Sequence, residues 1–265
     1  MSGLALFAGT GGLPAALVRA LGDEVPLICA LDGFPPEGVK PEITFRIERL
    51  VPFLDALTER GVTRLCLAGA VRRPRLDPAL FDPATAQIVP RLVGAMQQGD
   101  DATLRAISGI FEEAGIAVVG VEDIAPGLLP GPGVLAGHVT PADEADATRA
   151  AAIVAALGAA DVGQGCVVAR GLCLAVEALP GTDAMLAQVA GLTGDLRPAK
   201  GLFYKAPKPG QDRRVDLPAL GVQTVINAAA AGLAGIAFEA GGVICLDLPA
   251  MQAEAAARGL FLWAR

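Results

Sequence analysis

Short apolar runs alternate with amphipathic stretches through the first half of the chain. The run at 4–8 meets a glycine-rich turn at 9–12, and Pro14 then opens a helical pattern that continues to Leu21. Further apolar runs lie at 25–31, 64–68 and 116–121, and further helical patterns lie at 53–60, 88–97 and 102–114. Strands that alternate with helices favour a parallel sheet. We therefore predict a Rossmann-like α/β domain with a parallel sheet over residues 1–130.

The stretch 126–141 is rich in proline and glycine, which stop helices and weaken strands, so we place a linker there. Beyond it, Asp143 is predicted as the N-cap of an alanine-rich helix that has Asp146 in its first turn and ends near Gly158. Strands are then predicted at 166–169, 172–178, 201–205, near 236 and at 243–246, and helices from Thr182 and from Thr224. This order predicts a second, mixed α/β domain over residues 141–265.

The stretch 217–238 carries no charged residue and is long enough to raise the question of a membrane span. Gln223, Thr224 and Asn227 interrupt it, and Gly232 and Gly235 break any long helix. A helix, a turn and a buried strand are therefore predicted in place of a span.

Composition narrows the class of protein. The chain has 265 residues, of which 53% are hydrophobic and 18% charged, and its formal net charge is −7. This supports a real core and argues against a nucleic-acid binder with a basic surface. The five cysteines are scattered and no secretory leader is apparent, so we expect a reduced, cytoplasmic setting. His138 is the single histidine, which excludes a zinc site built on several histidines.

The glycine-rich turn is the first candidate site, and it consists of Gly9, Thr10, Gly11 and Gly12. It lies between a predicted strand and a predicted helix, so backbone N–H groups and the helix dipole can bind a phosphate. Pro14 occupies a position where a dinucleotide-binding fingerprint has glycine, although Asp32 lies at about the right distance for a ribose contact. Two interpretations of the glycine-rich turn therefore remain: it contacts a phosphate, or it is a tight turn that serves helix packing.

A cationic segment between residues 197 and 214 is more informative. It contains Arg197, Lys200, Lys205, Lys208, Arg213 and Arg214. Pro207 and Pro209 prevent an ordinary helix, so these cations should sit on extended or looped backbone that can surround a ligand. In an acidic protein such a patch favours a phosphate ligand. The alternative is a solvated surface loop.

Asp212 and Asp216 stand beside these cations and suggest a metal-phosphate site. Mg²⁺ prefers carboxylate oxygens, water and substrate phosphate. If the segment is extended, Asp212, Arg214 and Asp216 share one face. The alternative is that the two acids only pair with Arg213 and Arg214.

Thr182 and Asp183 follow Gly181 at a predicted helix start. Thr182 is predicted as the N-cap, and Asp183 is favoured by the helix dipole. The same N-terminus can instead face a phosphate or a hydrated metal ion. Residues 99–101, Gly-Asp-Asp, are likewise predicted as a loop and helix start.

These motifs together resemble the UDP-2,3-diacylglucosamine pyrophosphatases of lipid A biosynthesis, of the magnesium-dependent type known from bacteria such as the alphaproteobacteria. The likeness covers nearly the whole chain and is strongest at 205–218, Lys-Ala-Pro-Lys-Pro-Gly-Gln-Asp-Arg-Arg-Val-Asp-Leu-Pro. Other matching motifs lie at 8–14, 69–74, 99–101, 161–164, 181–185, 231–236 and 239–241. Pro180 stands where the family has glutamate, and Leu220 where isoleucine is usual.

The resemblance implies a Mg²⁺-dependent hydrolase with its site between two domains. Such an enzyme splits the diphosphate of UDP-2,3-diacylglucosamine into UMP and 2,3-diacylglucosamine 1-phosphate (lipid X). Asp216 matches the family's essential aspartate and is the expected catalytic residue and metal ligand, with Thr182 and Asp183 as further catalytic residues. With the glycine-rich turn included, the expected substrate-binding residues are Gly9, Thr10, Gly11, Gly12, Lys205, Lys208, Gln211, Asp212 and Arg213.

Two acyl chains would need an apolar chamber, and the high apolar content is compatible with one and with transient contact at the inner membrane surface. A homodimer is also a possible partner arrangement.

The sequence leaves two rival functions open. One is a NAD(P)-dependent oxidoreductase that uses the glycine-rich turn and Asp32, and the other is a non-catalytic protein that binds a nucleotide or a lipid.

Overall fold

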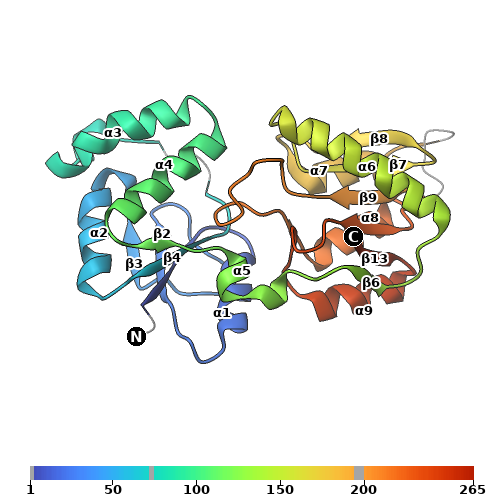
Figure 1. The fold of residues 1–265 in the computed structure, drawn as a ribbon, viewed down its shortest axis with the longest axis horizontal. Helices are drawn as coiled ribbons and strands as arrows, with labels where there is room; N and C mark the ends of the chain where they lie inside the picture. Colours follow the sequence, from blue (N-terminus) through green and yellow to red (C-terminus); the bar gives the residue numbers. More distant parts are fainter. Residues whose placement is uncertain (1–2, 72–74, 194–199) are drawn as a thin grey trace. The chain divides into compact units, whose positions relative to one another are not determined.

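The computed structural model describes residues 3–71, 75–193 and 200–265, with only the backbone of Asp100 and Asp101. The contacts of the chain divide it into two compact units (Figure 1). Unit 1 contains the residues up to Pro126 together with Asp212–Asp216, and unit 2 contains Gly127–Gln211 and Leu217–Arg265. The segment Asp212–Asp216 therefore stands between two parts of unit 2 along the chain but groups with unit 1.

In the described part of unit 1, five strands form a parallel sheet in the order β3-β2-β1-β4-β5. These are β1 (Leu4–Ala8), β2 (Leu27–Leu31), β3 (Ile43–Phe45), β4 (Arg64–Ala68) and β5 (Ala117–Val118). The helices are α1 (Leu13–Leu21), α2 (Leu50–Glu59), α3 (Pro83–Met96), α4 (Asp100–Glu113) and α5 (Val121–Ile124), with 3-10 turns at Ile47–Arg49 and Pro78–Leu80. A third 3-10 turn, Pro126–Leu128, lies where the chain passes from unit 1 to unit 2. The strand order reverses between β1 and β4, as in a Rossmann-like domain, so the predicted fold is confirmed. The edge strand β3 was not predicted.

A series of phenylalanine rings ties the sheet of unit 1 to its helices. Phe45 of β3 stacks on Phe53 of α2, with ring centroids 3.7 Å apart. Phe7 of β1 meets Phe45 edge to face, and Phe111 of α4 meets Phe53 in the same way. All four rings belong to one buried cluster, so α2 and α4 share a core with one face of the sheet.

The loops that follow β1 and β4 approach each other closely where the strand order reverses. A Cβ atom at Gly9 would lie 2.5 Å from the carbonyl oxygen of Ala70, and one at Gly69 would lie 2.6 Å from that of Thr10. The backbones of Thr10 and Ala70 exchange two hydrogen bonds, of 2.9 and 3.0 Å. Both positions therefore require glycine.

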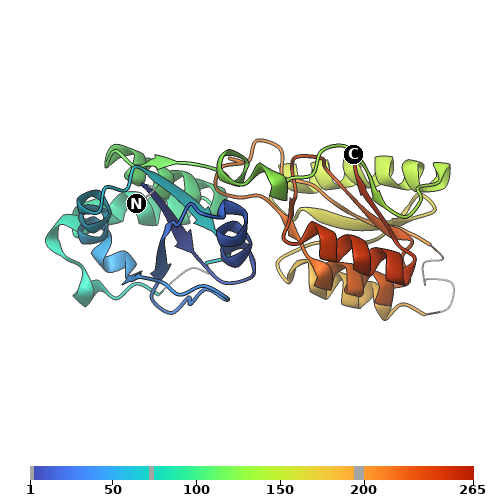
Figure 2. The same cartoon turned by 90° about the horizontal axis from the view of Figure 1, so that it is seen from below.

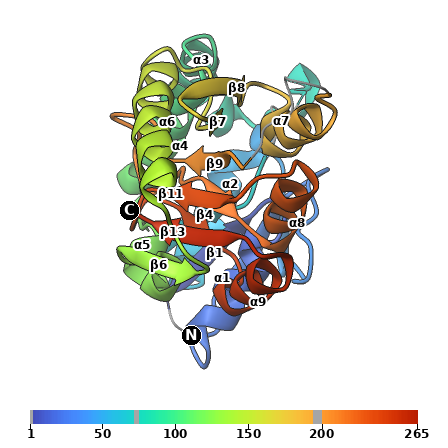
Figure 3. The same ribbon diagram turned by 90° about the vertical axis from the view of Figure 1, so that its right-hand side faces the viewer.

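In the described part of unit 2, six strands form a mixed sheet in the order β6-β13-β11-β9-β7-β8. The predicted mixed α/β class is confirmed, whereas the strand order was not predicted. The strands of this sheet are β6 (Gly133–Ala136), β7 (Gly165–Ala169), β8 (Leu172–Val176), β9 (Leu202–Lys205), β11 (Gly235–Phe238) and β13 (Phe261–Ala264), while β10 (Ala219–Leu220) pairs with β12 (Ile244–Cys245). The helices are α6 (Pro141–Ala159), α7 (Gly181–Ala190), α8 (Val222–Ala230) and α9 (Leu248–Arg258). Helix α6 covers one face of the sheet and α7, α8 and α9 cover the other (Figures 2 and 3).

Strand β6 lies within the stretch predicted as a linker. It pairs antiparallel with β13 and forms one edge of the sheet. A sheet edge tolerates glycine and proline, because an edge strand forms fewer ladder hydrogen bonds. The composition of this stretch therefore predicted a linker where the structure has an edge strand.

Alternation along β9 sends its side chains into two different cores. Leu202 and Tyr204 enter the core beneath α6, whereas Phe203 enters the core shared with α7, α8 and α9. Lys205 follows the same period of two and points to the α7 side, where it meets Thr182. The strand therefore delivers a buried lysine to the start of α7.

Two predicted N-caps are wrong. Thr140 caps α6, and Asp143 is the third residue of that helix, where its carboxylate accepts hydrogen bonds from the Thr140 N–H and hydroxyl at 2.9 and 2.6 Å. This reciprocal capping box places the N-cap three residues before Asp143, and the helix starts at Pro141. Helix α7 starts at Gly181, so Thr182 lies inside its first turn and its hydroxyl is engaged elsewhere.

Among the described residues, none of the helices combines the length and the hydropathy that a membrane crossing requires. The uncharged stretch 217–238 contains β10, α8 and β11. The prediction of a helix and a buried strand in this stretch is confirmed.

We expect Gly9→Ala to destabilise unit 1 by about 1–3 kcal/mol, because the added methyl group would overlap the Ala70 carbonyl and force the two loops apart. Gly94→Ala is the matched control. Gly94 lies inside α3 with open space around its Cβ position, so alanine should stabilise the protein by about 0.5–1 kcal/mol. Urea denaturation followed by circular dichroism measures both changes. Equal stability of the two variants contradicts the prediction.

Candidate active site

Lys205, Thr182 and Glu177 meet at the carboxyl end of β9. The Lys205 side chain is buried, and its ammonium group donates a hydrogen bond to the Thr182 hydroxyl at 2.7 Å. That hydroxyl donates in turn to Oε1 of Glu177 at 3.0 Å, and Nζ of Lys205 lies 3.7 Å from the same oxygen. The structure therefore brings together two predicted site residues, Thr182 and Lys205, and adds a carboxylate.

The start of α7 places Thr182 in this cluster. Gly181 has a φ of +85°, a left-handed conformation that favours glycine, and it turns the chain from Pro180 into the helix. Thr182 is then the second residue of α7 and faces the end of β9. The glycine of the Gly-Thr-Asp motif thus has a conformational role.

Asp183 is the next residue of α7 and is held by α8. The side-chain N–H of Asn227 donates to Oδ1 of Asp183 at 2.9 Å, and Oδ1 of Asn227 accepts from Gln223 at 2.9 Å. The carboxylate also lies in the first turn of α7, where the helix dipole favours negative charge. Asp183 is therefore oriented by neighbouring side chains.

The loop after β9 has the irregular backbone that its prolines predict. The Lys208 ammonium pairs with Asp161 at 2.5 Å, and the side-chain oxygen of Gln211 accepts the N–H of Lys208 at 2.9 Å. Lys200 precedes β9 whereas Lys205 ends it, so these two lysines lie at opposite ends of the strand. The expectation that all the cations surround one ligand is wrong for Lys200, and Arg197 lies outside the described residues.

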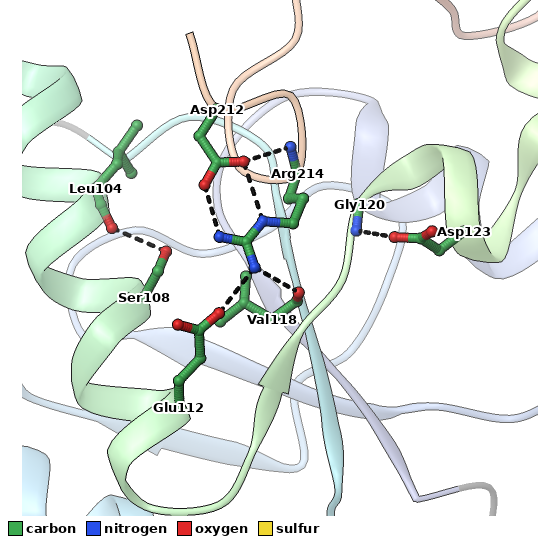
Figure 4. A network of polar contacts seen from close by, with 8 residues as sticks. All are labelled: Leu104, Ser108, Glu112, Val118, Gly120, Asp123, Asp212 and Arg214. Carbon is green, nitrogen blue, oxygen red and sulfur yellow. Dashed lines mark hydrogen bonds and ion pairs between the residues drawn. The ribbon is translucent and has the colours of Figure 1, made fainter.

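Arg214 anchors the segment Asp212–Asp216 to unit 1 (Figure 4). Its guanidinium donates to the two carboxylate oxygens of Asp212 at 3.1 and 2.8 Å, to Glu112 of α4 at 2.8 Å and to the carbonyl oxygen of Val118 at 3.4 Å. Hydrogen bonds from Arg214 hold the pKa of the Asp212 carboxyl below its ordinary value, and the two acids raise the pKa of Arg214. The alternative in which the two acids pair with Arg213 and Arg214 is therefore confirmed for Asp212 and Arg214.

This segment forms a turn, so of the two predicted forms, extended or looped, the looped one is present. The N–H groups of Val215 and Asp216 both donate to the carbonyl oxygen of Asp212, at 3.1 and 3.2 Å. A Cβ atom at Gly120 would lie 3.0 Å from Cα of Arg214, so glycine lets the turn pack closely against unit 1. Exposed Arg213 lies within the turn. Asp212, Arg214 and Asp216 therefore do not share one face of an extended strand, because hydrogen bonds to the carbonyl oxygen of Asp212 fold the segment into a turn.

A cavity of about 320 Å³ opens in unit 1 beside Asp216. It lies at the carboxyl end of the parallel sheet, where the strand order reverses and where open α/β sheets bind their ligands. Asp216 is the one charged residue among the described residues that line it. Most of the wall is apolar, and α3 and α4 contribute Leu92, Met96, Leu104, Ile107 and Phe111.

Several hydrogen-bond donors of the glycine-rich turn are already committed to the protein. The N–H of Gly9 donates to the last carbonyl of β4 at 2.7 Å, and the N–H and hydroxyl of Thr10 donate to the carbonyl of Ala70 at 2.9 and 3.0 Å. Gly11 and Gly12 are exposed, and Gly12 is the N-cap of α1. The turn therefore has a packing role, and substrate contact by its residues stays a prediction.

The described residues contain no group of three or more histidine, cysteine, aspartate or glutamate side chains that could hold a metal ion. Mg²⁺ does not require such a cage, since proteins commonly bind it through one or two carboxylates together with water and substrate phosphates. The Asp216 carboxylate in the cavity lining fits a site of that kind.

Sequence reasoning missed Glu177 and Glu112. Glu177 follows β8. Strand β7 pairs antiparallel with both β8 and β9, so β8 and β9 run in the same direction and their carboxyl ends lie at the same end of the sheet. Knowledge of the strand order would have placed Glu177 near Lys205. No local signal marks Glu112, because its partner Arg214 lies 102 residues further along the chain.

Two family models match this chain. The model of the LpxI N-terminal domain matches residues 3–128, and that of the LpxI C-terminal domain matches residues 131–263. The chain belongs to the LpxI family. A member of this family, the UDP-2,3-diacylglucosamine pyrophosphatase LpxI of Caulobacter vibrioides, is 38% identical over 278 residues, which cover 99% of this chain and 97% of the relative. The resemblance drawn from the motifs is confirmed.

Membership of the LpxI family decides against the oxidoreductase interpretation. Asp32 does follow β2, as a ribose-binding acid does in a dinucleotide-binding domain. Its carboxylate, however, accepts a hydrogen bond from Arg46 at 3.0 Å. The likeness to a dinucleotide-binding domain is therefore one of topology.

We expect Arg214→Gln to lower the free energy of unfolding at pH 7 by about 1–2 kcal/mol, because the partly exposed pairs with Asp212 and Glu112 are lost together. The pKa of Asp212 is lowered in the folded protein, so its pairing stabilises above the unfolded pKa of about 3.9 and is lost as the pH falls through the lowered value. The deficit of the variant should therefore shrink below about pH 4.

Urea denaturation at pH 7 and pH 3 measures this difference. Arg258→Gln is the control, because it breaks an i,i+4 pair with Glu254 on α9 and should cost no more than about 0.5 kcal/mol. A deficit of Arg214→Gln that is the same at both pH values contradicts the assigned role.

Proposed function

We propose that this protein hydrolyses the diphosphate bond of UDP-2,3-diacylglucosamine and releases UMP and 2,3-diacylglucosamine 1-phosphate for lipid A biosynthesis. Its similarity to the Caulobacter vibrioides pyrophosphatase, 38% identical along 99% of this chain, supports the activity. The structural observation that carries the proposal is the position of Asp216, a carboxylate in the lining of an apolar cavity. A substrate with acyl chains and a reactive diphosphate requires both features.

We assign an acyl chain of the substrate to the cavity of unit 1. Its volume of about 320 Å³ lies within the range of pockets that bind small molecules, and its lining is mostly apolar. Each buried CH₂ group contributes about 0.8 kcal/mol to binding. A chain in this cavity would bring the sugar phosphate towards Asp216.

The cations of residues 205–218, the signature segment, bind the diphosphate in this proposal together with Gln211. Lys205 ends β9, and Lys208, Gln211 and Arg213 follow it within a few residues. Each charge-assisted hydrogen bond to a phosphate oxygen contributes roughly 1.5–3 kcal/mol. Because Lys208 pairs with Asp161, the substrate phosphate would have to compete with that carboxylate.

We assign Mg²⁺ to Asp216, together with phosphate oxygens of the substrate. When bound, the ion would neutralise charge on the diphosphate and orient a water molecule. Both oxygens of Asp212 accept hydrogen bonds from Arg214, and Asp212 is therefore the acid that holds the turn. Arg214 keeps Asp216 in place in the cavity lining by anchoring the residues before it.

We also propose transient contact with the cytoplasmic face of the inner membrane, because the substrate and product each carry two acyl chains. Apolar side chains are exposed at the edge of unit 2 that carries Lys205: Val176 ends β8, and Leu179 is fully exposed. Such side chains suit contact with a lipid surface. A cytoplasmic location and a homodimer stay predictions.

We expect Asp216→Asn to lower kcat by at least about 100-fold while the substrate still binds, because the carboxylate acts mainly in the transition state. Chelation with EDTA should abolish hydrolysis by the wild type, and added Mg²⁺ should restore it. In Asp216→Asn no concentration of Mg²⁺ should restore the rate. Release of UMP from UDP-2,3-diacylglucosamine is the measurement.

Asp55→Asn is the matched control, since Asp55 is exposed on α2 and lies outside the cavity. It should retain wild-type turnover. Normal turnover of Asp216→Asn would reject the assignment of that carboxylate. A wild type that binds the substrate but leaves it intact in the presence of Mg²⁺ would make the protein a carrier and not an enzyme.

We expect Leu104→Trp to fill part of the cavity and to lower kcat/KM for substrates with long acyl chains by about 10-fold or more, because the lost apolar contacts amount to several CH₂ groups. Substrates with short acyl chains should be affected much less. Leu80→Trp is the control, since Leu80 is 40% exposed and lies outside the cavity. An equal loss of kcat/KM for every chain length would show that the cavity does not hold the acyl chains.

A further inference from the structure

Glu177 stands at the centre of the polar contacts around Lys205. It follows β8, and its side chain is 14% exposed. Oε1 accepts the hydroxyl of Thr182 at 3.0 Å and lies 3.7 Å from Nζ of Lys205. One carboxylate oxygen therefore contacts two residues of the site.

Two glycines let the chain close around Glu177. A Cβ atom at Gly163 would collide with the carbonyl oxygen of Glu177, and one at Gly165 would lie 2.7 Å from Oε2. The peptide N–H of Glu177 also donates to the carbonyl of Gly165 at 2.8 Å. The backbone at the start of β7 thus sets the position of the carboxylate.

Burial of the Glu177 carboxylate is costly unless a nearby charge compensates it. Oε2 is buried and, within the part of the chain that the structure describes, has no hydrogen-bond partner. Buried polar atoms are normally satisfied, and exceptions call for an explanation. The Lys205 side chain is only 9% exposed, and a buried cation requires a nearby anion. Glu177 supplies that negative charge.

The direction of the hydrogen bonds makes Thr182 depend on Glu177. A threonine hydroxyl has a single hydrogen to donate. Thr182 donates it to Glu177, while its oxygen accepts from the Lys205 ammonium. Thr182 therefore connects the carboxylate to the ammonium group and orients that group at the end of β9.

We propose that Glu177 is a positioning residue for hydrolysis of the diphosphate and that it acts through Thr182 and Lys205. This inference rests on the proposed function. Glu177 holds the Lys205 ammonium in one orientation, in which it meets the negative charge that develops on the diphosphate. Misplacement of such a group by about 1 Å can cost about 100-fold in rate. The loss of Glu177 therefore acts on kcat more than on substrate binding.

A double-mutant cycle on Glu177→Gln and Lys205→Met tests the inference. Glu177→Gln keeps the size of the side chain and removes its charge, and we expect kcat to fall about 10–100-fold with KM changed less than about threefold. In the Lys205→Met background the same change should have little further effect on kcat, because the group that Glu177 positions is already gone. Unchanged kcat in Glu177→Gln, or losses that multiply in the double variant, overturn the inference.

Thermal unfolding provides a second measurement that does not need turnover. Glu177→Gln should lower the melting temperature by about 2–4 °C when Lys205 is present. It should raise the melting temperature in Lys205→Met, where the charged carboxylate is buried without its partner. If the wild type does not hydrolyse the substrate, the proposed function fails. The opposite shifts of the melting temperature in the two backgrounds would still show that the charges of Glu177 and Lys205 are coupled.

Glu254→Gln is the control variant, because Glu254 forms an ion pair on the surface of α9 and should leave kcat and KM unchanged. If Glu177→Gln does not fold, Thr182→Val tests the same connection, since it removes both hydrogen bonds of the hydroxyl. We expect Thr182→Val to lower kcat about 10-fold or more and Thr182→Ser to retain it. Equal activity of the valine and serine variants overturns the inference.

Discussion

The ion pairs of the Arg214 guanidinium hold the segment Asp212–Asp216 in unit 1. Arg214 pairs with Asp212 beside it and with Glu112 on α4, and so holds five residues in unit 1 although the chain on either side of them belongs to unit 2. The turn closes on itself through the carbonyl of Asp212. Asp216 can line a cavity because the residues before it are fixed, and a functional group on an unanchored loop would lose that geometry.

Three cations between residues 205 and 214 are paired with acids of the protein itself. Lys205 faces Glu177, Lys208 pairs with Asp161, and Arg214 pairs with Asp212. Any anion that bound these cations would have to compete with the carboxylates, in a protein whose formal net charge is −7.

Most predictions of element type from local periodicity succeeded, whereas several predictions of helix caps and of side-chain partners failed. The alternation of apolar runs and helical patterns predicted both α/β domains, and Pro207 and Pro209 predicted an irregular loop. Thr182 was wrongly expected to cap α7, because its hydroxyl bonds to Lys205, 23 residues further on. Asp212, Arg214 and Asp216 would share one face only in an extended segment, and the N–H groups of Val215 and Asp216 close a turn on the Asp212 carbonyl oxygen instead. The partner of Arg214 on α4, Glu112, lies 102 residues away along the chain and was not predicted.

The sequence by itself determined the family, the two-domain α/β class and the residues of the signature segment, because each of these depends on residue types at short spacing. Only the tertiary structure decided that Glu177 joins Thr182 and Lys205, and that side chains of α3 and α4 form an apolar cavity beside Asp216. These juxtapositions follow from which strands lie side by side and which loops meet at a sheet edge. Periodicity along a strand specifies the face that a side chain takes, but it does not specify the neighbouring strand.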